Sequence, residues 1–275
     1  MQLRDRVAIV TGASGGIGSP TVRAFAAAGA HVVLAAPQSE LPVLKELAAD
    51  VERFGVRALV VPTDVAIRAE IDQLVKSTLD TFGRIDILAN IAGIGSPPAL
   101  WDTTDEELRK VIEVNLLGCA RTIHAVMPVM KRQRRGAIVN IGSVAGEGGV
   151  LGIYSASKFG LRGLNDTVRR EVRSWNIEVS LIEPGFVRSN INASMGENLP
   201  SPDIVARAIV RAVTRPRRRI IVPAIWGLPV ALDKLFPGFT DLVFGHPRIQ
   251  QRLNRDVRAA RGERSPVSSK NPWTD

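Results

Sequence analysis

The first 185 residues alternate short, β-branched apolar runs with longer stretches whose apolar residues recur at helical spacing. The apolar runs, which we predict as strands, span residues 7–11, 31–36, 57–62, 85–89, 137–141 and 178–182. The amphipathic stretches, which we predict as helices, span residues 17–28, 40–54, 69–82, 105–130 and 154–175. Strands that are apolar throughout and alternate with helices form parallel sheets with both faces covered, and their crossovers are right-handed. The pattern therefore predicts an α/β fold in three layers (α/β/α), with a doubly wound parallel sheet in the middle.

After residue 185 the alternation becomes less regular. Residues 201–213 have the spacing of a further helix, and residues 220–222 that of a last short strand. Residues 224–245 are rich in Pro, Gly, Phe and Leu, which predicts irregular structure with short helices. We expect residues 1–245 to form a single domain and residues 246–275 to form a basic C-terminal tail that is partly disordered.

The chain is basic, with a formal net charge of +9 among 275 residues. Arginines gather at positions 132–135, at 215–219 and in residues 246–275, where seven Lys and Arg oppose three Asp and Glu. This distribution favours a solvated basic surface, and an acidic partner is the alternative. No aromatic-rich basic module accompanies the charge, so nucleic-acid binding is not expected.

Cysteine and histidine are scarce and scattered. The single cysteine, Cys119, cannot pair within the chain, which is typical of a reducing compartment, and we expect a cytoplasmic protein. His31, His124 and His246 are too far apart in sequence to show metal-ligand spacing. A metal site is therefore not expected.

No stretch of the chain is predicted to cross a membrane. The first residues are polar and lead into a glycine-rich segment rather than a signal-peptide cleavage site. The longest apolar run, residues 220–232, has thirteen residues and is interrupted by proline and glycine, whereas a spanning helix needs ~20. With the preceding arginines this run could make peripheral contact with an anionic membrane surface, although its beginning fits a last strand better.

A glycine-rich segment, Thr11-Gly12-Ala13-Ser14-Gly15-Gly16-Ile17-Gly18, follows the first predicted strand and begins the first predicted helix. Small residues at such a turn let the backbone approach a pyrophosphate, and the helix N-terminus presents N–H groups and a positive dipole to it. Glycine is also common in ordinary turns. The position between strand one and helix one of a doubly wound pattern nevertheless favours dinucleotide binding.

Two further segments, which follow the second and third predicted strands, concern the binding of the dinucleotide. An acidic residue at the end of strand two selects NAD and a basic residue accommodates the 2′-phosphate of NADP, but residues 35–38 are Ala-Ala-Pro-Gln. The sequence favours NADP because no carboxylate there repels the 2′-phosphate. NAD remains the alternative cofactor because no arginine is present to bind that phosphate. Asp64, after strand three, could bind an adenine amino group or cap the following helix.

Tyr154 is the only tyrosine of the chain, and Lys158 follows it by four residues. In a helix this spacing places both side chains on one face. A phenol has a pKa of about 10, and a neighbouring ammonium favours its phenolate form. Tyr154 could then exchange a proton with an alcohol or a carbonyl oxygen, whereas the alternative is an ordinary pair on a helix surface.

Three polar residues upstream support a site at Tyr154. Ser143 follows the fifth predicted strand, at the sheet edge where α/β proteins bind ligands, and can hydrogen-bond a substrate carbonyl. Asn115 interrupts an apolar helix and needs a partner if it is buried, which a water bound also to Lys158 would supply. Asn90, in Asn90-Ile91-Ala92-Gly93, ends the fourth strand beside the glycine-rich segment.

These motifs together resemble the short-chain dehydrogenase/reductase family over roughly residues 5–190. The resemblance implies a Rossmann-like catalytic domain, a nicotinamide cofactor, and a homodimer or homotetramer formed through the helices that carry Asn115 and Tyr154. It implies a catalytic set of Asn115, Ser143, Tyr154 and Lys158. It also implies cofactor contacts from Gly12, Ser14, Gly15, Gly16, Ile17, Gly18, Asp64, Val65, Asn90, Ala92, Gly93, Tyr154, Lys158, Pro184, Gly185, Val187 and Ser189.

Three features depart from the family pattern, and none of them removes a catalytic side chain. Ile91 stands where a second asparagine is usual, and strand two lacks the residues that select the cofactor. The separation of eleven residues between Ser143 and Tyr154 is shorter than usual. The short separation predicts a substrate loop of different shape, in which the glycines between these two residues absorb the difference.

The predicted substrate is a small molecule, an apolar ketone or secondary alcohol. Residues 186–240 contain apolar side chains that suggest a lid, or else ordinary core and subunit contacts, at Phe186, Ile191, Met195, Leu199, Trp226, Leu228, Phe236 and Phe239. We therefore predict an NAD(P)-dependent oxidoreductase that moves a hydride between the cofactor and such a substrate. The alternatives are a non-catalytic dinucleotide-sensing or scaffold protein, and a membrane-associated carrier of an apolar ligand.

Overall fold

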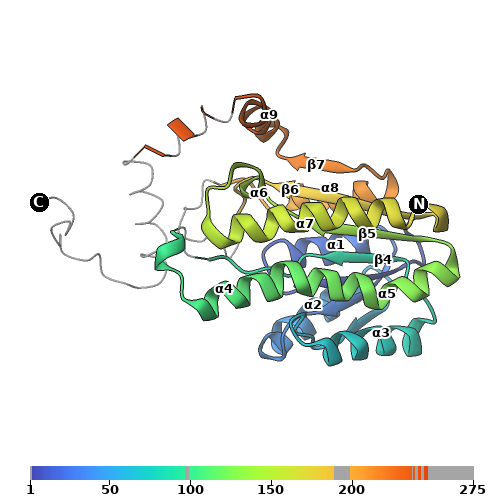
Figure 1. Ribbon diagram of the computed structural model, residues 1–275. Helices are drawn as coiled ribbons and strands as arrows, with labels where there is room; N and C mark the ends of the chain where they lie inside the picture. The colour runs from blue at the N-terminus through green and yellow to red at the C-terminus, as the bar shows by residue number, and fades with distance from the viewer. Residues whose placement is uncertain are drawn as a thin grey trace, which may run out of the picture.

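The computed structural model describes residues 2–96, 99–188, 199–236, 238, 241–242 and 245–246, and they build three layers around one sheet (Figure 1). The sheet has seven strands in the order β3-β2-β1-β4-β5-β6-β7, and every neighbouring pair is parallel. The strands are β1 Val7–Thr11, β2 His31–Ala35, β3 Ala58–Val60, β4 Ile87–Asn90, β5 Gly136–Ile141, β6 Ile177–Pro184 and β7 Arg219–Val222. The prediction of a doubly wound parallel sheet is confirmed.

Helices cover both faces of the sheet. One core cluster joins the sheet to α1, α2 and α8 through side chains such as Phe25, Leu44 and Ile209, and the other joins it to α3, α5 and α7 through side chains such as Leu74 and Ile123. The α-helices are α1 Gly18–Ala27, α2 Leu41–Glu52, α3 Arg68–Phe82, α4 Asp105–Ile112, α5 Cys119–Gln133, α6 Ala145–Gly148, α7 Gly152–Glu171, α8 Asp203–Thr214 and α9 Gly227–Leu235. Short 3₁₀ segments lie at Gln38–Glu40, Leu100–Asp102, Arg173–Trp175 and Ala224–Trp226.

The order of the strands reverses between β1 and β4. Strands β2 and β3 follow on one side of β1, and β4 to β7 follow on the other. In open parallel sheets the loops diverge at such a reversal, and a crevice forms outside the carboxyl ends of the strands. The fold therefore brings the segments after β1, β4 and β5, predicted as functional from the sequence, to one edge of the sheet.

The long predicted helix over residues 105–130 is in fact three segments. Helix α4 ends at Ile112, a π-helical stretch spans Glu113–Gly118, and α5 begins at Cys119. Gly118 approaches the loop after β3 so closely that a Cβ on it would lie 2.7 Å from Cγ2 of Val65. The sequence pattern over residues 105–130 did not distinguish this six-residue π-helical stretch from the α-helices on either side of it.

The second half of the chain follows the sequence pattern closely. Residues 220–222 belong to β7, which pairs with β6, so this part of the longest apolar run lies in the sheet. Residues 224–245 do contain short helices, the 3₁₀ segment Ala224–Trp226 and α9. Among the described residues no helix has the length and apolar character needed to cross a bilayer. Apart from His246, the predicted tail lies outside the described residues, and the cytoplasmic location and the domain bounds stay predictions.

Candidate functional site

A cavity lies at the carboxyl ends of β4, β5 and β6, against the first half of α7. Three of the four predicted catalytic residues line it, and the fourth, Asn115, lies directly behind. Apolar residues from four loops complete the wall. The lining residues are Ile17, Ile91, Gly93, Ile141, Gly142, Ser143, Val144, Ala145, Leu151, Tyr154, Lys158, Pro184, Gly185, Phe186 and Val187.

The glycine-rich segment forms a tight turn between β1 and α1. Gly12 has a φ of +65°, and a Cβ on it would lie 2.8 Å from the backbone of Ala92. A Cβ on Gly18 would lie only 1.9 Å from the carbonyl oxygen of Gly12. The Thr11 hydroxyl accepts hydrogen bonds from the amides of Ile91 and Ala92, at 3.1 and 3.2 Å, and so ties this turn to the end of β4.

This turn fits the dinucleotide that the sequence predicted. Glycines leave the backbone bare around the N-terminus of α1, where free N–H groups and the helix dipole favour a phosphate. Gly12, Ser14, Gly15, Gly16, Ile17 and Gly18 are the predicted contacts in this turn, and all of them are described. Side chains added at Gly12 or Gly18 would meet the backbone, which explains why glycine is needed there.

We expect Gly18→Ala to weaken the binding of NADPH or NADH by at least about tenfold. Relieving a contact of 1.9 Å displaces the turn at a cost of about 1–3 kcal/mol, and 1.4 kcal/mol corresponds to a factor of ten. Fluorescence titration measures the affinity. Gly163→Ala in α7 is the control, because its Cβ would meet open space, and it should bind normally and be stabilised by about 0.5–1 kcal/mol. Equal affinity in both variants would contradict the assignment of the turn.

Tyr154 and Lys158 lie one turn apart on α7 and are both buried. The Lys158 ammonium lies 5.7 Å from the centre of the Tyr154 ring and donates a hydrogen bond of 2.9 Å to the carbonyl oxygen of Ile141. The hydroxyls of Tyr154 and Ser143 line the same cavity, close enough for Ser143 to act on the pKa of Tyr154. Ser143 is itself fixed by the Ala145 amide, which donates to its hydroxyl at 3.1 Å. The phenol, the ammonium and the serine hydroxyl thus meet in one cavity.

Burial dominates the titration of both groups. It raises the pKa of Tyr154 above its usual value, and the Ser143 hydroxyl only partly opposes this. It lowers the pKa of Lys158 from 10.5 to about 8. Burial is the larger effect on the pKa of Tyr154, and the Lys158 ammonium is hydrogen-bonded to the Ile141 carbonyl. At neutral pH the pair consists of a neutral phenol and an ammonium.

Asn115 lies in the π-helical stretch and connects two segments of the site. Its Oδ1 accepts from the amide of Ile94 at 2.8 Å, and its Nδ2 donates to the Ile94 carbonyl at 2.9 Å and to Ser157 Oγ at 3.1 Å. Ile94 and Ser157 are thus direct partners of the Asn115 side chain, and the water predicted to link it to Lys158 stays a prediction. A Cβ on Gly93 would lie 3.3 Å from Asn115 Oδ1 and 3.4 Å from Lys158 Nζ, so both groups border Gly93.

Asn90 belongs to a buried polar network that sequence reasoning missed. Its Nδ2 donates to Asn140 Oδ1 at 3.0 Å, and its Oδ1 accepts from the Thr122 hydroxyl at 2.7 Å. Asn140 in turn donates to Asn165 Oδ1 at 3.1 Å. This network fixes β4 and β5 to α5 and α7 directly beneath the cavity. The signal was present, since an asparagine within an apolar strand needs a buried partner.

Asp64 and Val65 lie in the loop between β3 and α3. Asp64 Oδ1 accepts from the amide of Ala66 at 2.9 Å, in a local turn. The interpretation of Asp64 as a helix cap is wrong, because α3 begins at Arg68 and its N-cap residue is Ile67. Val65 lines a small pocket together with Thr11 and Ala92.

The end of β6 carries the remaining predicted contacts. Pro184, Gly185 and Val187 line the cavity, whereas Ser189 lies outside the described residues, as do Ile191, Met195 and Phe239. Trp226 covers Gly185 so closely that a Cβ there would lie 2.2 Å from the indole.

Five of the predicted lid residues are described: Phe186, Leu199, Trp226, Leu228 and Phe236. Phe186 meets Trp226 edge to face, with ring centres 5.5 Å apart. Leu199 is half-buried. Leu228 and Phe236 do not cover the cavity, because they are 68% and 62% exposed on and just after α9.

The chain is similar in sequence to known proteins. Residues 6–200 match the family model of short chain dehydrogenases. A 3-oxoacyl-[acyl-carrier-protein] reductase of Synechocystis sp. is 40% identical over 205 residues, 74% of this chain and 81% of that protein. An uncharacterized oxidoreductase of Bacillus subtilis is 31% identical over 256 residues, 87% of this chain and 71% of that protein.

The fold is similar to that of a solved structure as well. The crystal structure of a short chain dehydrogenase/reductase from Burkholderia phymatum in complex with NAD superposes with a TM-score of 0.80. The two chains are 25% identical, and the match covers 87% of this chain and 96% of that one. The present chain belongs to the short-chain dehydrogenase/reductase family and is an oxidoreductase of that family.

Proposed function

We propose that the protein reduces an apolar ketone, or oxidises the corresponding secondary alcohol, with Tyr154 as general acid and base. The observation that carries this proposal is that Ser143, Tyr154 and Lys158 line one cavity at the carboxyl ends of the strands. When bound, a nicotinamide cofactor supplies or accepts the hydride. The chain's own side chains transfer the proton and position the substrate.

In the reducing direction Tyr154 donates its hydroxyl proton to the oxygen of the substrate carbonyl and is left as a phenolate. Burial keeps the pKa of Tyr154 high, so this proton is present at neutral pH. Ser143 hydrogen-bonds the same carbonyl and positions it. The ammonium of Lys158 stabilises the phenolate, and in the oxidising direction the proton moves back from the alcohol to Tyr154. Asn115 holds the Ile94 backbone and Ser157, and so keeps the loop after β4 and helix α7 in place.

The residues proposed to hold the cofactor are those the sequence predicted. The glycine-rich turn would take the pyrophosphate, Asp64 and Val65 the adenine, and the ends of β4 and β6 the nicotinamide. The residues proposed to hold the nicotinamide are Asn90, Ala92, Gly93, Pro184, Gly185, Val187 and Ser189. After β2, Pro37 and Gln38 are exposed and bring no carboxylate, which supports NADP over NAD.

Apolar side chains around the cavity support an apolar substrate. Ile91, Leu151 and Phe186 line it, and Trp226 covers Gly185 at its edge. One relative is a 3-oxoacyl-[acyl-carrier-protein] reductase, so 3-oxoacyl thioesters belong among the compounds to be tested. We also propose that the protein forms a homodimer or homotetramer, because Leu117 and Phe159 are exposed beside Asn115 and Tyr154.

The decisive experiment has two steps. Fluorescence titration with NADPH and NADH should show binding of both, with NADPH the tighter, because no carboxylate after β2 repels the 2′-phosphate. Turnover with the tighter cofactor is then measured on a panel of apolar ketones, 3-oxoacyl thioesters and charged keto sugars. Reduction of an apolar member supports the proposal. Binding without turnover of any member would instead favour the non-catalytic dinucleotide sensor.

A further inference from the structure

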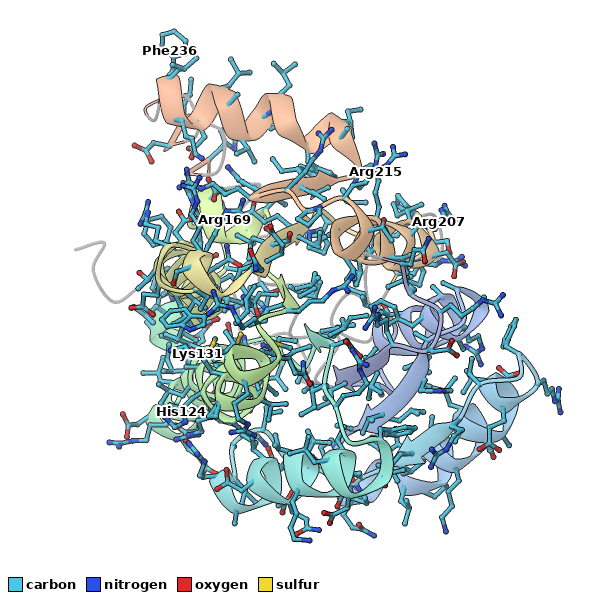
Figure 2. All side chains as sticks on the ribbon, turned by 90° about the vertical axis from the view of Figure 1, so that its right-hand side faces the viewer. His124, Lys131, Arg169, Arg207, Arg215 and Phe236 are labelled. Carbon is cyan, nitrogen blue, oxygen red and sulfur yellow. The ribbon has the colours of Figure 1, made fainter. Side chains whose placement is uncertain are left out.

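Helix α9 presents an apolar face that the described part of the chain leaves uncovered. Leu228, Leu232 and Leu235 recur at intervals of four and three residues, which places them on one side of the helix, and Ile225 lies in the 3₁₀ segment just before it. Ile225, Leu228 and Leu235 are 68–78% exposed. Phe236 follows them and projects away from the rest of the molecule in Figure 2.

The opposite face of α9 is fixed to the protein. Trp226, Val230 and Lys234 recur every four residues and face inward. The indole of Trp226 packs on Gly185, Val230 is buried, and the Lys234 ammonium lies 2.8 Å from the Glu147 carboxylate. Because its inner face is held at three points along its length, α9 presents the apolar face rigidly.

Positive charge accompanies this apolar face. Arg215, Arg217 and Arg218 are exposed in the loop before β7, and β7 and α9 lie along the same edge of the molecule (Figures 1 and 2). Residues 247–275, which follow in the sequence, carry seven Lys and Arg against three Asp and Glu. Helix α9 itself contains one acidic residue, Asp233. An exposed apolar helix face on the same edge of the molecule as a basic loop matches an anionic lipid surface in both respects.

We propose that α9 docks the protein on the surface of an anionic phospholipid bilayer, with the side chains of Ile225, Leu228, Leu235 and Phe236 entering the interface. A second copy of the chain is a poorer occupant. Nine residues at ~1.5 Å per residue give a helix of ~14 Å, and a contact between two such ridges falls short of the ~1,200 Å² that stable interfaces bury. This inference does not depend on the proposed reaction.

Co-sedimentation of the full-length protein with vesicles tests the proposal. One set of vesicles contains equal parts of phosphatidylglycerol and phosphatidylcholine, and the other contains phosphatidylcholine alone. The wild type should bind the anionic vesicles at low salt, bind the neutral ones weakly, and be released from the former by high salt. Leu228→Glu/Leu235→Glu should lower binding to anionic vesicles by at least about tenfold.

The matched control is Phe54→Glu, which changes a 52% exposed apolar residue after α2, toward the opposite edge of the sheet. It should bind vesicles like the wild type. Arg215→Glu/Arg217→Glu changes only exposed loop residues and should also weaken binding, which keeps the test valid if the leucine variant fails to fold. No wild-type binding at low salt, or equal loss in Phe54→Glu, overturns the proposal. A lower solution mass of the leucine variant, without vesicle binding by the wild type, would assign α9 to self-association instead.

Discussion

Tyr154→Phe should lower the turnover number by about 10²–10⁴-fold, the usual contribution of a positioned proton donor. The substitution removes one hydroxyl and keeps the buried ring, so the proton donor is lost while the packing of α7 is retained. The affinity for NADPH should stay close to that of the wild type, because the glycine-rich turn is unchanged. Steady-state kinetics and fluorescence titration measure the two quantities separately.

The matched control is Thr167→Val, which removes a hydroxyl from the same helix at an exposed position. It should leave turnover unchanged. If Tyr154→Phe kept the activity of this control, the proposed proton transfer would be refuted, whether or not the protein binds a dinucleotide.

The sole tyrosine also allows its titration to be observed directly. Because the chain contains one tyrosine, the absorbance of tyrosinate in the folded protein reports Tyr154 alone. Its midpoint should lie above the ordinary value of about 10, because burial disfavours the phenolate. Lys158, with a pKa of about 8, is an ammonium below that pH and neutral above it. Ketone reduction should therefore be constant through neutral pH and decline as the pH rises above about 8.

The sequence predicted the sheet well because buried parallel strands are apolar throughout, and β1 lies where the pattern placed it. The meeting of Ser143, Tyr154 and Lys158 was predictable for a different reason. The carboxyl ends of parallel strands share one edge of a sheet, and residues four apart share one face of a helix. Both arguments use only short-range spacing.

Contacts between distant segments were not predictable in this way. The network of Asn90, Asn140 and Asn165 joins residues 25 and 50 positions apart, and no local pattern pairs them. The pairing of Asn115 with Ile94 is a contact of the same kind, since the two residues lie 21 positions apart. Trp226 was predicted as apolar lid, but its packing on Gly185 depends on how β6 and β7 align in the sheet.

Glu147 is the clearest example of such a long-range contact. Its carboxylate is 2% exposed and lies 2.6 Å from Arg162, 3.0 Å from Arg219 and 2.8 Å from Lys234. These partners come from α7, β7 and α9, while Glu147 lies in α6, four residues after Ser143. Burial acts to raise the pKa of Glu147, but the hydrogen bond from Lys234 and the two guanidinium charges outweigh it and hold the pKa below its usual value. The carboxylate is therefore charged at neutral pH and joins four elements.

Glu147→Gln should destabilise the protein by about 2–4 kcal/mol. Removing one partner of a buried ion pair costs about 3–5 kcal/mol, and the figure is lower here because Arg162, Arg219 and Lys234 keep 23–41% exposure. Because the folded pKa of Glu147 is lowered, its stabilising contribution is present above the unfolded value of 4.5 and is lost as the pH falls. Urea unfolding at neutral pH measures the loss.

Glu178→Gln is the matched control, since Glu178 is 51% exposed and its pair with Arg169 spans 3.7 Å. It should change stability by less than about 1 kcal/mol. Equal, small losses in both variants would mean that the charges around Glu147 are solvated and do not join the four elements. A large loss confined to Glu147→Gln would mean that α9 and the loop carrying Ser143 are held by the same carboxylate, so that a change at α9 can reach the substrate end of the cavity through Lys234 and Glu147.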